Sequence, residues 1–308
     1  MWGKNQKTLN SEVRFSGIGL HSGESVDVTL TPANSNSGIT FKRTDLEKNN
    51  EVIANFKNVS SAKLCTKIEN DFGVSVSTVE HLMAAFYICG IDNLVVNLNG
   101  REVPIMDGSA KDFVRIIKNC GLKTLKGKRK VVKIKKKIEL KEDDKLINIV
   151  PSNSFEVKFT LDYKKSPLIQ TQINSANFKD KNLEDIYTAR TFCLYEDIEE
   201  IKSIGLAKGG SLDNAVVVQG DKILNEGGLR SKKEFVNHKI LDLAGDFMLS
   251  GARVVGFVEC VHGGHALTNK FLKKIFSDKS NYNIAESESS SPNVRKILPL
   301  NKRLAVNA

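Results

Sequence analysis

The chain has 308 residues, of which 40% are hydrophobic and 27% charged, as is typical of a globular protein with room for two domains. No apolar run approaches the ~20 residues of a membrane-spanning helix, and the first residues lack the apolar stretch of a signal peptide, so we expect a cytoplasmic protein. The five cysteines form no Cys-x-x-Cys pair, which favours reduced thiols over a disulfide framework or a cysteine-ligated zinc site.

The net charge of +10 is concentrated in one segment. Residues 121–137 hold nine basic side chains and no acidic one, so the rest of the chain is nearly neutral. We interpret this run as a solvated linker between domains that leads into an edge strand. Alternatively, the run is a surface that attracts nucleotide phosphate or makes transient contact with an anionic membrane. If the protein is not an enzyme, the charge suggests a basic nucleic-acid-binding protein. Aromatic residues do not interleave with the lysines, which argues against a nucleic-acid partner.

The first half reads as strands followed by helices. Polar and apolar residues alternate in short runs from Asn10 to Lys42, which predicts antiparallel strands. Helical periodicity runs from Thr78 to Ile88 and ends at Gly90. A strand at 93–98 and an amphipathic helix that ends at Cys120 follow.

The second half repeats this order. Its predicted elements are strands at 145–150, 155–161, 215–219 and 253–260, and helices at 195–203, 232–250 and 266–276. The order helix, glycine, strand, loop, helix thus occurs at 78–119 and again at 232–276. We therefore predict an α+β fold of two similar layered α/β sandwich domains related by internal duplication. Their expected limits are 1–125 and 126–280, with a polar, mobile tail at 281–308.

A polar column lies on the predicted helix 232–250. His238, Asp242 and Asp246 are spaced four residues apart and so share one face of an otherwise apolar segment. The imidazole and the first carboxylate can reach one metal ion. A lone His-x-x-x-Asp is more often a hydrogen-bonded pair, but two further histidines of the five, His262 and His265, follow closely. This concentration favours a functional site.

A metal site of this kind needs a third ligand and a base, which His81 and Glu80 could supply. His81 would complete a set of two nitrogens and one oxygen, which suits zinc or iron(II) and leaves a position for water. Glu80 could take a proton from that water, although its spacing from Ser77 also fits a helix capping box. His265, oriented by Asp246, could donate a proton to a leaving group. This assembly predicts a metal-dependent hydrolase at the junction of the two domains, and a non-haem iron oxygenase is the alternative enzyme.

Several motifs together resemble a known family. They are STVEHL (77–82), PIMDGS (104–109), ARTF (189–192), GGS (209–211), LNE (224–226), EFVNHKILD (234–242) and GHAL (264–267). In order and spacing they are similar to the motifs of the LpxC family, the UDP-3-O-acyl-N-acetylglucosamine deacetylases of the lipid A pathway in Gram-negative bacteria. The resemblance spans about residues 10–276.

The resemblance implies a fold, a reaction and a set of residue roles. It implies helices packed between the sheets of two sandwich domains, a zinc site at their junction, a UDP-acyl-sugar substrate, and an insert at 194–220 that forms a passage for the acyl chain. We expect a monomer. The implied roles are zinc ligation by His81, His238 and Asp242, general base for Glu80, acid for His265 with Asp246, carbonyl polarisation for Thr191, and substrate contact for Phe192 and Lys239.

Overall fold

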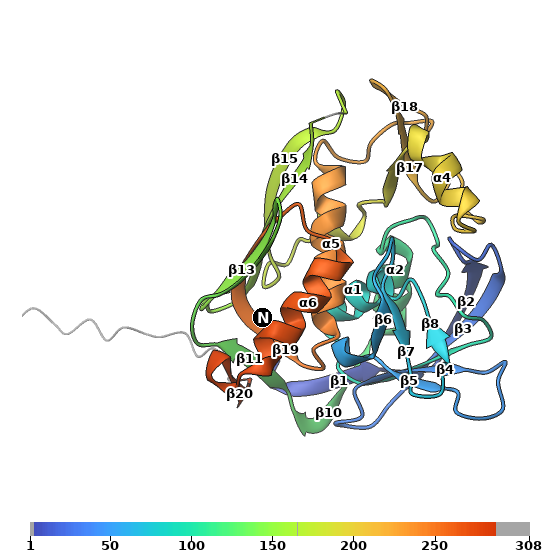
Figure 1. The fold of residues 1–308 in the computed structure, drawn as a ribbon. Coiled ribbons are helices and arrows are strands. Elements are labelled where there is room, and N and C mark those ends of the chain that lie inside the picture. The colour runs from blue at the N-terminus through green and yellow to red at the C-terminus, as the bar shows by residue number, and fades with distance from the viewer. Residues whose placement is uncertain (1–2, 165, 288–308) are drawn as a thin grey trace, which may run out of the picture.

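Two large sheets enclose a pair of helices, α1 (Glu80–Cys89) and α5 (Glu234–Met248), which pack against each other (Figure 1). The computed structural model describes residues 3–164 and 166–287, and the folding pattern is a mixed α+β one. The helices predicted at 78–88, 232–250 and 266–276 are confirmed, the last as α6 (His265–Ser277). Within the described ranges, every helix is too short or too polar to cross a membrane.

The first sheet is built from residues 13–98. Its strand order is β2 (Val13–Ile18), β3 (Ser25–Pro32), β9 (Leu94–Leu98), β4 (Ile39–Arg43) and β5 (Glu51–Ile53). β9 pairs antiparallel with β3 and parallel with β4. In β3, Val26, Val28 and Leu30 are buried while the intervening side chains are more exposed, as expected where one face of a sheet is covered.

The second sheet is built from residues 130–286. Its strands are β11 (Lys130–Ile134), β12 (Ile138–Glu142), β13 (Lys145–Val150), β14 (Phe155–Tyr163), β15 (Gln170–Asn177), β19 (Arg253–Val261) and β20 (Tyr282–Glu286). β19 is central: it pairs antiparallel with β13 and parallel with both β14 and β11. β12 continues the sheet beyond β13, and β15 continues it beyond β14.

Smaller elements join and extend the two large sheets. β1 (Asn5–Leu9) pairs with β10 (Leu122–Lys128), and β6 (Val59–Ser61), β7 (Lys67–Glu69) and β8 (Ser75–Val76) form a small sheet. β16 (Phe192–Leu194), β17 (Val216–Gln219) and β18 (Lys222–Ile223) form another, beside α4 (Ile198–Ser203). The other helical segments are α2 (Lys111–Cys120), α3 (Glu184–Tyr187), η1 (Phe56–Asn58), η2 (Tyr195–Asp197) and η3 (Lys279–Asn281).

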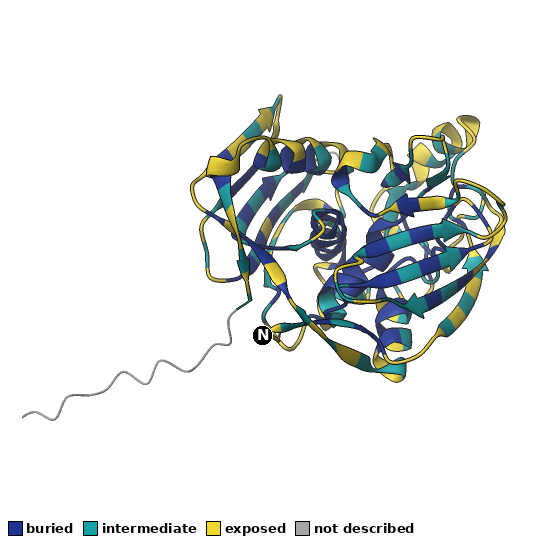
Figure 2. Ribbon diagram, turned by 90° about the horizontal axis from the view of Figure 1, so that it is seen from below, coloured by how far each residue is buried: buried dark blue, intermediate teal, exposed yellow. Residues whose placement is uncertain are grey.

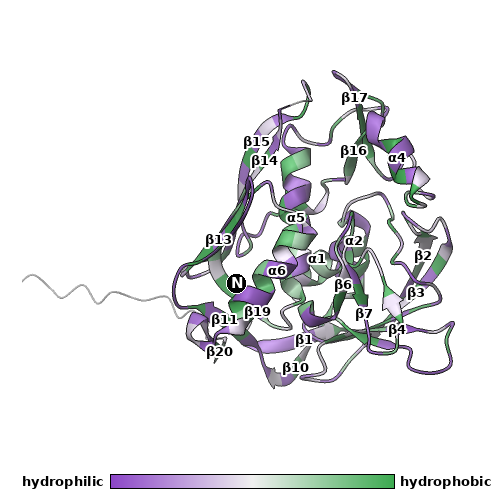
Figure 3. Cartoon of the chain, in the orientation of Figure 1, coloured by the Kyte–Doolittle hydropathy of each residue, from purple (hydrophilic) through white to green (hydrophobic). Residues whose placement is uncertain are grey.

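Helix α5 is buried on nearly every side. All of its side chains except that of Lys239 are buried (Figure 2), and hydrophilic and hydrophobic residues occur together along it (Figure 3). α1 crosses it at Gly245, where a Cβ would lie only 2.0 Å from the carbonyl oxygen of Glu80. Glycine therefore sets the close approach of the two helices. Polar groups on such a buried helix must find partners inside the protein.

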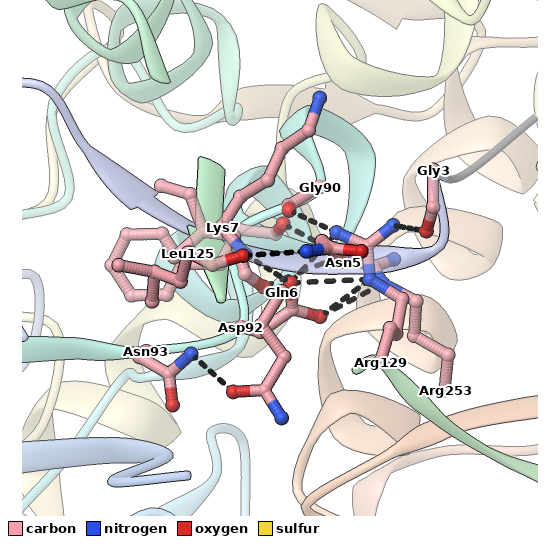
Figure 4. Close-up of polar contacts among 12 residues, drawn as sticks. Gly3, Asn5, Gln6, Lys7, Gly90, Asp92, Asn93, Leu125, Arg129 and Arg253 are labelled. Carbon is pink, nitrogen blue, oxygen red and sulfur yellow. Dashed lines mark hydrogen bonds and ion pairs between the residues drawn. The ribbon is translucent and has the colours of Figure 1, made fainter. Parts of the chain in front are cut away.

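The basic run forms β10 and β11, and β11 is not the edge strand that we predicted. β11 lies between β19 and β20, inside the second sheet. Arg129 is buried, and its guanidinium contacts the Asp92 carboxylate at 2.7 Å and the Gly90 carbonyl oxygen at 2.9 Å (Figure 4). Arg253 contacts the same carboxylate at 3.6 Å. The lysines of the run are exposed, but this arginine ties the run to the end of α1.

The predicted tail begins later than expected. Residues Tyr282–Glu286 form β20, which pairs antiparallel with β11 and covers that edge of the sheet. Residues 288–308, the remainder of the predicted tail, lie outside the described residues.

Candidate functional site

The three predicted metal ligands meet between the two central helices. His238 and Asp242 lie one turn apart on α5, and His81 lies in the first turn of α1. Both imidazole Nε2 atoms are 3.4 Å from the same carboxylate oxygen, Oδ1 of Asp242. All three side chains are buried, and each offers a ligand atom within 4.8 Å of the others.

The charge states of this cluster suit a cation. Burial lowers the pKa of His238 to about 3 despite the nearby Asp242 carboxylate, so the imidazole is neutral at physiological pH. Its Nδ1 donates to the carbonyl oxygen of Ala189 at 3.0 Å, which leaves Nε2 as the nitrogen with a free lone pair. Although burial opposes its charge, the ammonium group of Lys239 holds the pKa of Asp242 well below its ordinary value. One imidazole nitrogen from each histidine and the Asp242 carboxylate thus face one point.

Glu80 stands beside the ligands rather than capping its helix. The residue at the N-cap of α1 is Val79, which makes no side-chain capping bond, so the capping-box interpretation is wrong. The backbone instead turns sharply at Thr78, with φ of +56°, and a Glu80 carboxylate oxygen accepts a hydrogen bond from the Thr66 N–H at 3.0 Å. Burial raises the pKa of Glu80 although His265 and His81 oppose this. A carboxylate with a raised pKa is a better proton acceptor.

His265 faces Glu80 across the site. Its Nδ1 is 2.8 Å from Asp246, and its Nε2 is 3.7 Å from Glu80. Burial disfavours the imidazolium, but the carboxylates of Asp246 and Glu80 outweigh that effect and raise the pKa of His265 to about 10. The Asp246 carboxylate also accepts a hydrogen bond from the Thr66 hydroxyl at 2.7 Å. His265 is therefore a protonated imidazole at neutral pH, paired with the Asp246 carboxylate, as the predicted acid role requires.

The three predicted substrate residues line the same region. Thr191 borders the small pocket above the metal ligands. Lys239 lies 3.1 Å from Asp242 and places its ammonium group 5.5 Å from the centre of the Phe192 ring. That ring also packs edge-on against His238, with ring centres 6.4 Å apart.

A cavity of about 360 Å³ opens next to this pocket. Leu20, His21, Leu64 and Thr191 line both spaces. The insert at 194–220 contributes much of the cavity wall, including Ile198, Ile201, Leu212 and Val217. Leu194, the first residue of the insert, packs against the core and does not line the cavity.

Several site residues carry no sequence signal that we recognised. Thr66, immediately before β7, donates hydrogen bonds to both Glu80 and Asp246 and lies outside every motif. Glu102 is buried and accepts hydrogen bonds from the Thr78 hydroxyl and the His21 backbone N–H. Nε2 of His21 is buried without a hydrogen-bond partner among the described residues. These residues are far apart in the chain, and only the tertiary structure brings them together.

Comparisons with known proteins agree with this geometry. A family model described as LpxC, UDP-3-O-acyl N-acetylglycosamine deacetylase, matches residues 6–277. The UDP-3-O-acyl-N-acetylglucosamine deacetylase of Geotalea uraniireducens is 43% identical over 282 residues, which cover 91% of each chain. The enzyme of that name from Aliivibrio fischeri is 41% identical over 93% of this chain and 95% of its own, and that from Myxococcus xanthus is 43% identical over 91% and 89%. The chain therefore belongs to the LpxC family.

Proposed function

We propose that the protein hydrolyses the N-acetyl amide of UDP-3-O-acyl-N-acetylglucosamine, which releases acetate and the free amine in the biosynthesis of lipid A. The observation that carries this proposal is the buried set of His81, His238 and Asp242, flanked by an acid and a base, in a chain that belongs to the LpxC family. Family membership favours a deacetylase over the iron oxygenase and the nucleic-acid-binding protein that the sequence left open.

The donor set fits zinc. Asp242 Oδ1 is buried and has no hydrogen-bond partner among the described residues, although two imidazole nitrogens lie 3.4 Å away. Such an oxygen is costly to bury unless it binds something. Two histidines and one carboxylate are a common ligand set of catalytic zinc, with iron(II) as a second metal that they could hold. Zinc, when bound, would polarise the amide carbonyl and lower the pKa of a water molecule.

Two neighbouring residues would carry out the two proton transfers, Glu80 as the base and His265 as the acid. The Glu80 carboxylate, fixed by the Thr66 N–H, would take a proton from the attacking water. The water oxygen bonds to the amide carbon, and the carbon–nitrogen bond then breaks. The His265 imidazolium, oriented by Asp246, would give its proton to the departing nitrogen. Thr191, which borders the pocket, would donate a hydrogen bond to the carbonyl oxygen as negative charge develops on it.

The substrate's parts suit the two adjoining spaces. The pocket above the ligands would hold the acetamide group, and the apolar cavity walled by residues 194–220 would hold the acyl chain. Phe192 lines the cavity, Lys239 lines the pocket, and both are partly exposed, so the ring could pack on the sugar and the ammonium group could attract phosphate. One substrate with an acyl chain, a sugar and a diphosphate would use all of these features.

We also propose that residues 1–125 and 126–280 are duplicated α+β domains. Support comes from the strand orders. In each half, a buried helix leads to a central strand, β9 or β19, with an antiparallel neighbour on one side and a parallel neighbour on the other. One further antiparallel strand extends each side, which gives the orders β2-β3-β9-β4-β5 and β12-β13-β19-β14-β15.

The reaction is tested by measuring acetate release from UDP-3-O-acyl-N-acetylglucosamine. The purified protein is assayed as isolated, after removal of metal with a chelator, and after restoration of one equivalent of zinc or iron(II). We expect activity to be lost with the metal and regained with zinc. A folded, zinc-loaded protein that releases no acetate would contradict the proposal.

A further inference from the structure

The polar column on α5 begins one turn earlier than the metal ligands, at Glu234. This side chain is completely buried and lies four residues before His238 on the same helix face. Its carboxylate accepts hydrogen bonds from Arg190 Nε at 2.8 Å, from the Arg190 backbone N–H at 3.1 Å and from the Arg230 backbone N–H at 2.6 Å. The Arg190 guanidinium also reaches the Gly228 carbonyl oxygen at 2.7 Å. Both charges are therefore paired and hydrogen-bonded.

The segment that carries Arg190 is attached to α5 at two successive turns. Arg190 binds Glu234, and the carbonyl oxygen of the preceding residue, Ala189, accepts the hydrogen bond from His238 Nδ1 at 3.0 Å. The next two residues, Thr191 and Phe192, enter the site and the apolar cavity. The same four-residue stretch thus orients a metal ligand and supplies two groups that line the substrate space.

We propose that Arg190 and Glu234 are positioning residues, which hold the Ala189 carbonyl against His238 and hold Thr191 and Phe192 at the entrance of the cavity. A metal-bound histidine depends on the partner of its other nitrogen, which fixes both the tautomer and the direction of the ring. The ion pair fixes that partner. This inference rests on the proposed function, since it assigns His238 to the metal.

A purely structural role is the competing explanation, because a buried ion pair broken on one side destabilises a protein wherever it lies. The chain offers a matched control in Arg129 and Asp92. In this pair Arg129 is buried and Asp92 is partly buried, and several guanidinium–carboxylate hydrogen bonds join them, with Nε at 2.9 Å and Nη2 at 2.7 Å from the carboxylate. It lies at the end of α1 opposite His81, where Arg129 binds the Gly90 carbonyl oxygen (Figure 4).

The test compares Glu234→Gln with the control Asp92→Asn. Zinc dissociation constants are measured by competition with a chromophoric chelator, without substrate, and the visible spectrum of the cobalt(II)-substituted protein reports ligand geometry. We expect Glu234→Gln to weaken zinc binding at least ~10-fold and to shift the cobalt spectrum, as loss of an outer-shell partner does. Asp92→Asn should lower the unfolding temperature and leave both readouts unchanged. Equal effects of the two variants on zinc binding would overturn the proposal.

Two further variants keep the proposal testable if Glu234→Gln does not fold. Arg190→Lys keeps the charge and the backbone donor but loses the planar fork, and should weaken zinc binding less than Glu234→Gln. The double variant Arg190→Met with Glu234→Leu removes both charges, so no unpaired ion is left in the core. A folded double variant with the zinc affinity and cobalt spectrum of the parent protein would refute a positioning role. Because these readouts need no substrate, they are independent of whether the parent protein releases acetate.

Discussion

Replacing Gly245 with alanine should lower both the free energy of unfolding and the catalytic rate. An added Cβ would lie 2.0 Å from the Glu80 carbonyl oxygen, 2.8 Å from its carbonyl carbon and 3.1 Å from its Cα. An ordinary carbon–oxygen contact needs at least ~3.4 Å. All three atoms are backbone, so no side chain can rotate away, and the two helices must move apart by on the order of 1 Å.

Helix propensity alone would predict the opposite change, a more stable protein. Alanine inside a helix is worth ~1 kcal/mol more than glycine. Overpacking a rigid contact costs ~1–3 kcal/mol, so we expect a net loss of up to ~2 kcal/mol. A misplacement of ~1 Å can cost ~100-fold in rate, and here it would displace the helix end that carries Glu80 and His81 from the helix that carries His238 and Asp242.

Urea unfolding, zinc content and deacetylase kinetics of Gly245→Ala should be measured on the same preparation. Gly245→Ser, which adds the same Cβ and a hydroxyl, serves as a second variant and should lose at least as much. A Gly245→Ala protein that is more stable than the parent, with unchanged zinc content and turnover, would refute the idea that this glycine sets the distance between α1 and α5.

The remaining predictions concern the acid, the base and the cavity. Glu80→Gln should keep its zinc and lose at least ~100-fold in turnover, and near-normal turnover would remove Glu80 from the proton transfers. Because His265 has a pKa raised to about 10, it is protonated at neutral pH, activity should fall as the pH rises through that value, and His265→Ala should abolish this alkaline limb of the rate profile. Thr66→Val removes the 2.7 Å hydrogen bond to Asp246 but keeps the backbone bond to Glu80, so we expect a shifted alkaline limb with unchanged zinc content; an unchanged profile would show that the hydroxyl has no role in orienting the acid. Ile201→Trp should narrow the apolar cavity and shift the preferred acyl chain to a shorter length, and an unaltered preference would place the acyl chain elsewhere.

The features that the sequence revealed are those with a local pattern. The period of α5 placed His238, Asp242 and Asp246 on one face, and the structure keeps them there. Glu80 and His81 were assigned to the site because they could supply a base and the third ligand, and the fold brings the start of their helix to α5.

The features that the sequence hid depend on contacts between distant segments. Arg129 looked like one more solvated base in a lysine-rich run, but its carboxylate partner, Asp92, is 37 residues away in the chain. Thr66 gives no periodic or motif signal, and its importance comes from standing between Glu80 and Asp246. Gly245 belongs to no motif in the sequence analysis, and only the packing of α1 shows why a side chain is excluded there. Long-range polar pairs and close backbone contacts leave no trace in residue spacing.

The division of the proposed metal ligands between α1 and α5 would link ion binding to the integrity of the whole core. His81 and His238 come together only when the two helices are packed, so the unfolded chain holds no preformed site. An ion that binds only the native state stabilises it by ~2.7 kcal/mol at a free concentration one hundred times its dissociation constant. Cells that are short of zinc would thus hold a less active protein that also unfolds, and is degraded, more readily.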